Sequence, residues 1–338
     1  MVHNEWLSRH GATAVRILSV AAAYYGGAKL GLLQELVRGQ VTPLWPPTGI
    51  ALTALLLLGL RTWPGIALGA FLVNVTLGPS LLVVLAIAAS NTLSPVLSCL
   101  LLRCAGFRVR MDRLRDAVAL VFLGALAGML VSSTVGSGVL VLSGALTRAD
   151  FWPTWAVWWT GDAMGVLVIT PVLLVLGTAR PSRRARIRPL RVAEAAALGI
   201  STFAVTQFAV SSAMNLLFLV SPFLIWAAFR FRHAGAAPCA LLVSTIAIVA
   251  AAERHGPFAH HDLFTNMVTL QAFNGITALT ALLLAAVITE RLDTQREIRR
   301  IVAQLSEALS DLEADASRGG WPPPQHRKPD GGRGERAG

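Results

Sequence analysis

The stretch AVALVFLGALAGMLVSSTVGSGVLVLS, residues 117–143, carries no charged side chain over 27 residues. A helix needs about 20 apolar residues to cross the hydrocarbon core of a bilayer, so this stretch is long enough to span it. The rest of the chain has the same character, because 54% of its 338 residues are hydrophobic and only 14% are charged. Soluble domains carry about 25% charged residues, so the composition predicts an integral membrane protein of the all-α class.

Nine further apolar segments lie on either side of this stretch. In chain order, the ten predicted segments are 14–33, 44–60, 62–78, 81–102, 117–143, 156–177, 192–211, 215–229, 235–252 and 267–290. The second, third and eighth are at or below the lower limit of about 17 residues for a span. The sequence therefore predicts a polytopic transmembrane helical bundle of about eight to ten spans, which occupies residues 1–291.

Arginines are distributed unevenly between the loops that join these segments. With the N-terminus in the cytoplasm, the loops on the cytoplasmic side contain 14 arginines and those on the outer side contain 3. The 14 are Arg61, Arg103, Arg108, Arg110, Arg113, Arg115, Arg180, Arg183, Arg184, Arg186, Arg188, Arg191, Arg230 and Arg232, and the 3 are Arg38, Arg148 and Arg254. This asymmetry predicts a multi-pass inner-membrane protein with both termini in the cytoplasm. It also accounts for the net charge of +11 without a nucleic-acid partner, so the lipid bilayer is the expected partner.

Charged, helix-favouring residues replace the apolar pattern at residues 292–317. Within them, apolar side chains recur at alternating steps of four and three residues, at Ile298, Val302, Leu305, Leu309, Leu312 and Ala316. This heptad spacing predicts a short cytoplasmic coiled-coil signalling helix, which continues the last span and joins two copies of the chain as a homodimer. Residues 318–338 are rich in Gly and Pro and are predicted to form a disordered tail.

Asp162 is a carboxylate inside a predicted span. Such a group is costly in a membrane, so it is either a functional residue or the structural partner of a cation or backbone group. Lys29, in the first predicted span, is the candidate cationic partner. Further polar residues occur within the spans, at Asn74, Asn91, Gln207, Gln271 and Asn274. They are expected to form interhelical hydrogen bonds, with the lining of a ligand cavity as the alternative.

Tryptophans concentrate on the outer side of the predicted topology, at Trp45, Trp152, Trp155, Trp158 and Trp159. An aromatic belt at the membrane interface explains such a distribution. The alternative is a pocket lined by Trp and Pro and open to the periplasm. Under that alternative, the residues expected to sense a ligand are Asp162, Trp158, Trp159, Trp45 and Lys29.

Three pairs of glycines are spaced four residues apart within predicted spans, namely Gly65 and Gly69, Gly124 and Gly128, and Gly161 and Gly165. This spacing lets two helix backbones approach closely. Tight packing within the chain is the expected role of all six glycines, and a dimer face is the alternative.

Catalytic and metal-binding motifs are missing from the sequence. It has no phosphate-binding loop, zinc-protease motif or nucleophile elbow, so no enzymatic activity and no cofactor are predicted. Glu253, His255, His260, His261 and Asp262 lie close together without regular ligand spacing. They are interpreted as a solvated loop, and no metal site is predicted.

Several stretches carry a family resemblance. They are Leu44–Ala51 (LWPPTGIA), Trp158–Leu167 (WWTGDAMGVL), Pro171–Leu174, Ser221–Phe231 and Ala278–Arg291. Together they resemble the bacterial membrane-associated sensor domain of the first type, of the MASE family. The resemblance implies an integral membrane sensor that usually precedes a histidine kinase or diguanylate cyclase domain. This chain carries no such domain after its last span, so a truncated kinase or cyclase, a fragment and a stand-alone sensor are all open.

These features together predict a signal sensor of a bacterial signal-transduction system, such as a two-component system. A stimulus from the membrane or periplasm, such as an unknown small ligand, would shift the bundle between two packings and reach a cytoplasmic output through the last span. A secondary transporter is the alternative, because transporters also combine polytopic bundles with intramembrane charges and broken helices. Substrate flux in vesicles would favour the transporter, whereas the coiled-coil exit helix favours the sensor.

Overall fold

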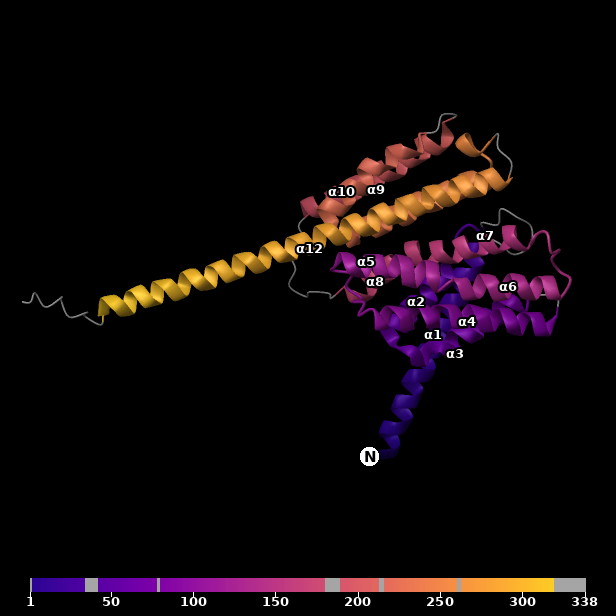
Figure 1. Cartoon of the computed structure of the whole chain (residues 1–338), viewed down its shortest axis with the longest axis horizontal. Helices are drawn as coiled ribbons and strands as arrows, with labels where there is room; N and C mark the ends of the chain where they lie inside the picture. Colours follow the sequence, from indigo (N-terminus) through magenta and orange to yellow (C-terminus); the bar gives the residue numbers. More distant parts are fainter. Residues whose placement is uncertain are drawn as a thin grey trace, which may run out of the picture. The chain divides into compact units, whose positions relative to one another are not determined.

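The computed structural model describes residues 2–33, 42–77, 80–179, 189–212, 216–259 and 263–318. Within these ranges every regular element is a helix (Figure 1). The α-helices are α1 (Val2–Leu32), α2 (Pro46–Leu58), α3 (Trp63–Asn74), α4 (Leu81–Cys104), α5 (Leu114–Ala119), α6 (Leu130–Leu142), α7 (Phe151–Met164), α8 (Thr170–Thr178), α9 (Pro189–Ser211), α10 (Ser221–Phe231), α11 (His233–Ala252) and α12 (Leu263–Arg318). Short 3-10 segments are η1 (Leu60–Thr62), η4 (Leu217–Val220) and η5 (Gly256–Phe258). The chain divides into two units, Met1–Glu290 and Arg291–Gly338.

Six helical stretches of the described chain are long and apolar enough to cross a membrane. They are Leu81–Cys104, Leu114–Leu142, Phe151–Thr178, Pro189–Ser211, His233–Ala252 and Thr265–Ala314. The all-α, multi-pass class is therefore confirmed. The predicted segments 14–33, 44–60, 62–78 and 215–229 lie in helices that are not among these six. The count of about eight to ten spans thus stays a prediction.

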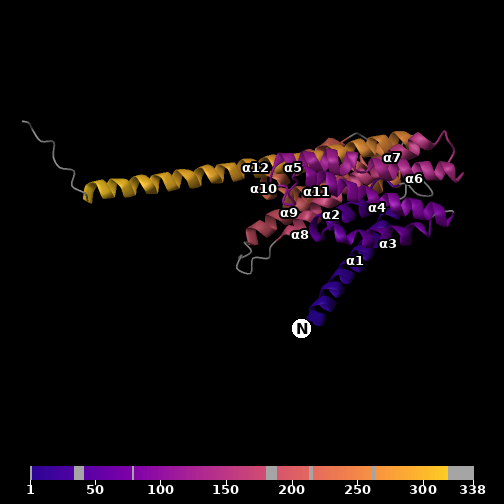
Figure 2. The ribbon, with the colours of Figure 1, turned by 60° about the horizontal axis from the view of Figure 1, so that its bottom comes forward.

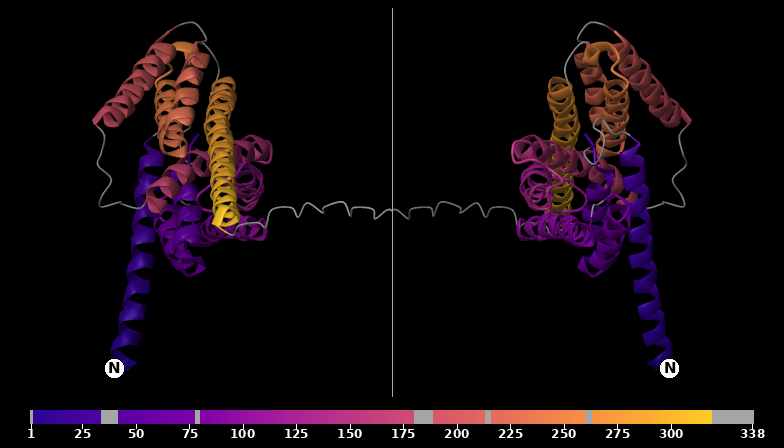
Figure 3. Two further views of the ribbon diagram at one scale, coloured as in Figure 1. Left: turned by 90° about the vertical axis from the view of Figure 1, so that its left-hand side faces the viewer. Right: turned by 90° about the vertical axis from the view of Figure 1, so that its right-hand side faces the viewer.

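The helices of the first unit share one core. Helix α1 packs against α2 and α3, and α3 packs against α4 (Figures 2 and 3). Tyr24, Leu52 and Leu102 are fully buried in this core. Large apolar side chains also cover the outside, where Leu82 is 79% exposed and Ile200 is 69% exposed. This is the character of a lipid-facing surface, where apolar side chains meet acyl chains instead of water.

All six glycines of the predicted pairs lie against other parts of the same chain. Their neighbours are Ile17 and Val20 for Gly65, Tyr24 for Gly69, Leu102 and Leu120 for Gly124, Ser98 for Gly128, Thr42 for Gly161, and Trp45 and Thr48 for Gly165. At Gly65, Gly161 and Gly165 the neighbour is a backbone carbonyl, which a larger residue would displace. These contacts hold α1 against α3 and hold the start of α2 against α7.

Two of the spans change from α to π geometry along their length. The π segment η2 (Leu120–Ala127) joins α5 to α6, and η3 (Gly165–Ile169) joins α7 to α8. Pro171 helps to explain η3, because a proline has no N–H to bond with the carbonyl four residues earlier and so opens the helix there. The two π segments contact each other. π segments are rare in proteins, and those that occur are frequently found at functional sites.

The second unit contains the last part of α12 (Leu263–Arg318). Five of its predicted heptad positions, Ile298, Val302, Leu305, Leu309 and Leu312, have exposed side chains, with exposed fractions from 55% at Ile298 to 66% at Leu312. Ion pairs within one turn, such as Arg296 with Asp293 at 2.7 Å, support the helix. The predicted disordered tail lies almost entirely outside the described residues.

Candidate functional site

The two most specific motifs of the sequence lie against each other. Helix α2 begins at Pro46 because the prolines at its first positions lack amide hydrogens that a first turn would leave unpaired. The Trp45 amide donates to the Gly161 carbonyl at 3.1 Å. The Thr48 hydroxyl contacts the carbonyls of Trp45 and Asp162 at 2.7 and 3.1 Å. Because Gly161 and Gly165 have no side chains, the segment before α2 approaches the backbone of α7 directly.

Asp162 is buried where α4, α6 and α7 meet, with 1% of its surface exposed. Its Oδ2 accepts a hydrogen bond from the Ser132 hydroxyl at 2.6 Å. The Ser132 amide in turn donates to the Ser94 hydroxyl at 2.7 Å. The other carboxylate oxygen, Oδ1, is buried and has no hydrogen-bond partner among the described residues. Half of the carboxylate is therefore available to a ligand.

A small cavity of about 40 Å³ lies beside this carboxylate. Its lining residues are Thr42, Trp45, Asn74, Leu77, Asn91, Trp158, Gly161 and Asp162. One water molecule needs about 10–15 Å³ of such a cavity, so about three water molecules fit in it. It brings together one carboxylate, two amides and two indoles from the segment before α2 and from α3, α4 and α7.

Tyr24 of α1 is fully buried, and its hydroxyl lies near Trp45, Asn91 and Asp162, three of the residues that line the cavity. Pro95 lies one helical turn after Asn91 in α4 and has no N–H to bond with the Asn91 carbonyl.

Three of the five residues predicted to sense a ligand line this cavity, namely Asp162, Trp158 and Trp45. Trp159 is not a lining residue, because its indole donates to the Leu126 carbonyl at 2.8 Å and its ring stacks on Trp155. The structure does not bring Lys29 to Asp162. The Lys29 ammonium is exposed over the Tyr25 ring, 5.4 Å from its centroid. The long lysine side chain reaches outward from the end of α1, which spares it burial.

The remaining polar residues of the predicted spans have separate positions. Asn74 and Asn91 line the cavity, and Gln207 lines a groove of about 430 Å³ between α9 and α11. On α12, Gln271 donates to the Pro43 carbonyl at 3.0 Å, and both amide atoms of the buried Asn274 lack partners among the described residues. Helix α12 thus contacts the segment that carries Trp45.

The loop of Glu253 and His255 contains no metal site within the part that the structure describes. The His255 ring pairs with the Glu253 carboxylate at 3.1 Å, and both side chains are exposed. His260, His261 and Asp262, which the sequence groups with them, lie outside the described residues.

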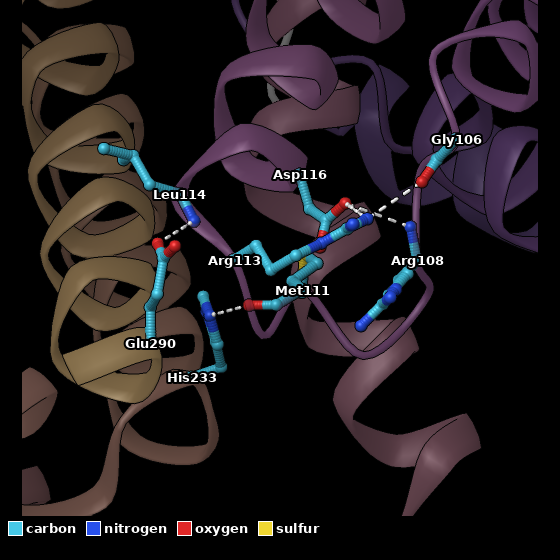
Figure 4. A network of polar contacts seen from close by, with 8 residues as sticks. All are labelled: Gly106, Arg108, Met111, Arg113, Leu114, Asp116, His233 and Glu290. Carbon is cyan, nitrogen blue, oxygen red and sulfur yellow. Dashed lines mark hydrogen bonds and ion pairs between the residues drawn. The ribbon is translucent and has the colours of Figure 1, made fainter. Parts of the chain in front are cut away.

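A second polar network lies where α4 ends and α5 begins (Figure 4). The buried Asp116 accepts hydrogen bonds from the Arg108 amide and from the Arg113 guanidinium, the closest at 2.7 Å. The bond to Asp116 raises the pKa of Arg113 above its ordinary value. The Glu290 carboxylate of α12 accepts a hydrogen bond from the Leu114 amide at 2.8 Å, and His233 contacts the Met111 carbonyl at the same distance. Helix α12 is therefore bonded to the first residue of α5.

Sequence reasoning missed Ser132, Tyr24, Asp116 and Glu290. Serine is common in packed membrane helices, so Ser132 carries no signal of its own. Asp116 follows a loop of five arginines, and this contrast of charge was a signal for an ion pair. Glu290 is the first acid after a long apolar run, which is a weaker signal of the same kind.

The bundle and its buried carboxylate define the chain as a multi-pass membrane protein with a polar cavity among its helices. MASE1, a family of membrane-associated sensor domains, matches residues 16–292, and the chain belongs to this family. The resemblance noted from Leu44–Ala51 and Trp158–Leu167 is thereby confirmed. Comparison with curated proteins and with solved structures gave no match.

Proposed function

We propose that this chain senses a stimulus at the cavity beside Asp162 and passes it to a cytoplasmic output through α12. One observation carries the proposal: α12 is bonded both to the Trp45 segment and to the start of α5. Gln271 binds the Pro43 carbonyl, and Glu290 binds the Leu114 amide. The two residues are separated by about 28 Å along the helix, which is close to the thickness of the hydrocarbon core.

In the proposed orientation, the cavity lies in the periplasmic half of the bacterial inner membrane and both termini are cytoplasmic. The cavity is lined by the segment before α2, by the end of α3 and by the first half of the span Phe151–Thr178, with Asn91 of α4. All of these lie on the outer side when the arginine-rich loops are cytoplasmic. The arginines of the Asp116 network lie at the opposite end of α4.

The contacts offer a second route from the cavity to α12. Asp162 is bonded to Ser132 on α6, and α6 leads back through the π segment η2 to α5. The first residue of α5 is bonded to Glu290. A change at Asp162 that shifts α6 would therefore also move α5 and alter the hydrogen bond between Leu114 and Glu290. Both routes converge on α12, and the mechanism is a shift in population between two packings of these helices.

The output of the proposed mechanism is self-association of the exit helix in a homodimer. The exposed positions Ile298, Val302, Leu305, Leu309 and Leu312 support this role, because their heptad spacing forms one apolar stripe. A downstream kinase or cyclase joined to this helix, or a separate partner that binds it, would read the association.

The test is to join residues 1–318 to a reporter histidine kinase and to compare Asp162→Asn with wild type. Loss of the response at normal membrane abundance is expected, because the substitution keeps the shape of the side chain and removes its charge. Asp150→Asn is the matched control, since Asp150 is an exposed acid in the loop before α7. An unchanged response in Asp162→Asn would remove the cavity from the mechanism.

A further inference from the structure

We propose that the cavity beside Asp162 binds a small monovalent cation. This inference deepens the proposed function, because it names the chemical class of ligand for the same site. It rests on the charge of the site, the number of its oxygen atoms and the size of the cavity.

Charge is the first argument. Asp162 is 99% buried, and none of the ion pairs of the described residues includes it. The cation that the sequence offered, Lys29, is exposed and contacts Tyr25 instead. A buried carboxylate without a compensating charge is strongly unfavourable in a membrane protein. Its Oδ1 has no hydrogen-bond partner among the residues that the structure describes, so this oxygen is free to bind a cation.

The surrounding groups are suited to an alkali or ammonium ion. Oxygens are offered by the Asn74 and Asn91 side chains, which line the cavity, and the Tyr24 hydroxyl lies close to three of the lining residues, Trp45, Asn91 and Asp162. The indoles of Trp45 and Trp158 also line the cavity, and aromatic faces attract cations.

A single carboxylate and a small volume exclude the other classes of ligand. Calcium takes six to eight oxygen ligands, commonly with several carboxylates, whereas this cavity has one acid. Among the described residues, no group of three or more His, Cys, Asp or Glu side chains is placed to hold a metal. A volume of about 40 Å³ is too small for a nucleotide, a peptide or a sugar and admits one small ion with a water molecule or two.

Binding would connect four parts of the bundle. The lining residues belong to the segment before α2 and to α3, α4 and α7, so an ion held by several of them would draw these helices together. The bound ion would also engage the oxygen of Asp162 that Ser132 does not use. Occupancy of the cavity would thereby change the contacts from which both routes to α12 begin.

The test uses the purified full chain in lipid nanodiscs and follows its unfolding temperature. Sodium, potassium and ammonium chloride are titrated separately at constant ionic strength, with N-methyl-D-glucamine chloride as the bulky cation that cannot enter. At least one small cation is expected to raise the unfolding temperature in a saturable manner, since a ligand that binds only the folded state stabilises it. The three salts distinguish which ion is preferred.

Asp162→Asn is expected to lose this dependence, whereas Asp150→Asn keeps it. If Asp162→Asn does not fold, Asn91→Leu carries the test and is expected to require a higher concentration of the cation. The proposal is overturned if no salt differs from N-methyl-D-glucamine, if the dependence survives Asp162→Asn, or if only pH changes the stability, which would make the proton the occupant. Binding without any change in reporter output would retain this inference and remove the proposed function, so the two can fail separately.

Discussion

The bond between Glu290 and the Leu114 amide is the contact through which α12 can respond to α5. Leu114 is the first residue of α5, and the amides of a first turn have no partner within their own helix. A carboxylate at such an end contributes about 0.3–1 kcal/mol at an exposed site, through the partial positive charge of the helix terminus. The 2.8 Å contact is exposed, so this range applies to it.

Glu290→Gln removes the charge and keeps the length of the side chain. A loss of about 0.3–1 kcal/mol changes an equilibrium by about twofold to fivefold. We expect hydrogen exchange of the Leu114 amide to accelerate by that factor in nanodiscs, measured by mass spectrometry of peptides that cover the start of α5. Basal output of a fused reporter kinase should change by a similar factor, because the bond favours one of the two packings.

The matched control is Asp293→Asn. Asp293 lies one turn further along α12, and its partner Arg296 is on the same helix, so this change removes an acid without touching α5. Equal exchange at Leu114 in Glu290→Gln and wild type would refute the reasoning. The reasoning would also fail if Asp293→Asn altered the output of the reporter kinase as strongly as Glu290→Gln does.

Three further predictions concern packing, association and orientation. Gly165→Ala should lower stability by about 1–3 kcal/mol in thermal unfolding, because the new methyl group meets the Trp45 carbonyl, whereas Gly138→Ala has open space and should change it by less than about 1 kcal/mol; equal effects would contradict the close approach. In a chain without its native cysteines, single cysteines along residues 298–312 should crosslink at heptad positions in membranes, and Leu305→Lys with Leu309→Lys should abolish that pattern; a pattern that survives the lysines would exclude a coiled coil. A cysteine at Ser182, in the arginine-rich loop, should resist a membrane-impermeant thiol reagent in intact cells and react after lysis, and labelling in intact cells would invert the proposed topology.

The class of fold was predictable because the composition and length of an apolar stretch identify it as a membrane-spanning helix. Stretches such as residues 117–143 can only be helical in lipid, where every backbone amide needs an internal partner. The π segments were not predictable in the same way. Leu120–Ala127 and Gly165–Ile169 have the same apolar composition as the α-helices around them, so composition and length do not distinguish them.

The site was predictable only in part, because one sequence gives residue types and not their neighbours. Asp162 and Trp45 stood out through cost and motif, and both line the cavity. Lys29 stood out for the same reason as Asp162, yet it avoids burial because it lies near the end of α1 and has a long side chain. Ser132, the hydrogen-bond partner of Asp162, lies 30 residues away on another helix and carries no distinguishing feature.

The absence of a lysine at Asp162 changes how the mechanism is understood. A permanent ion pair would lock α1 to α7, and such a lock leaves little for a stimulus to change. In Asp162, Oδ2 is instead bonded to Ser132 on α6, and Oδ1 has no partner among the described residues and is open to a ligand. Because a ligand shifts an equilibrium only by its differential affinity for the two states, an incomplete site is what such a sensor needs.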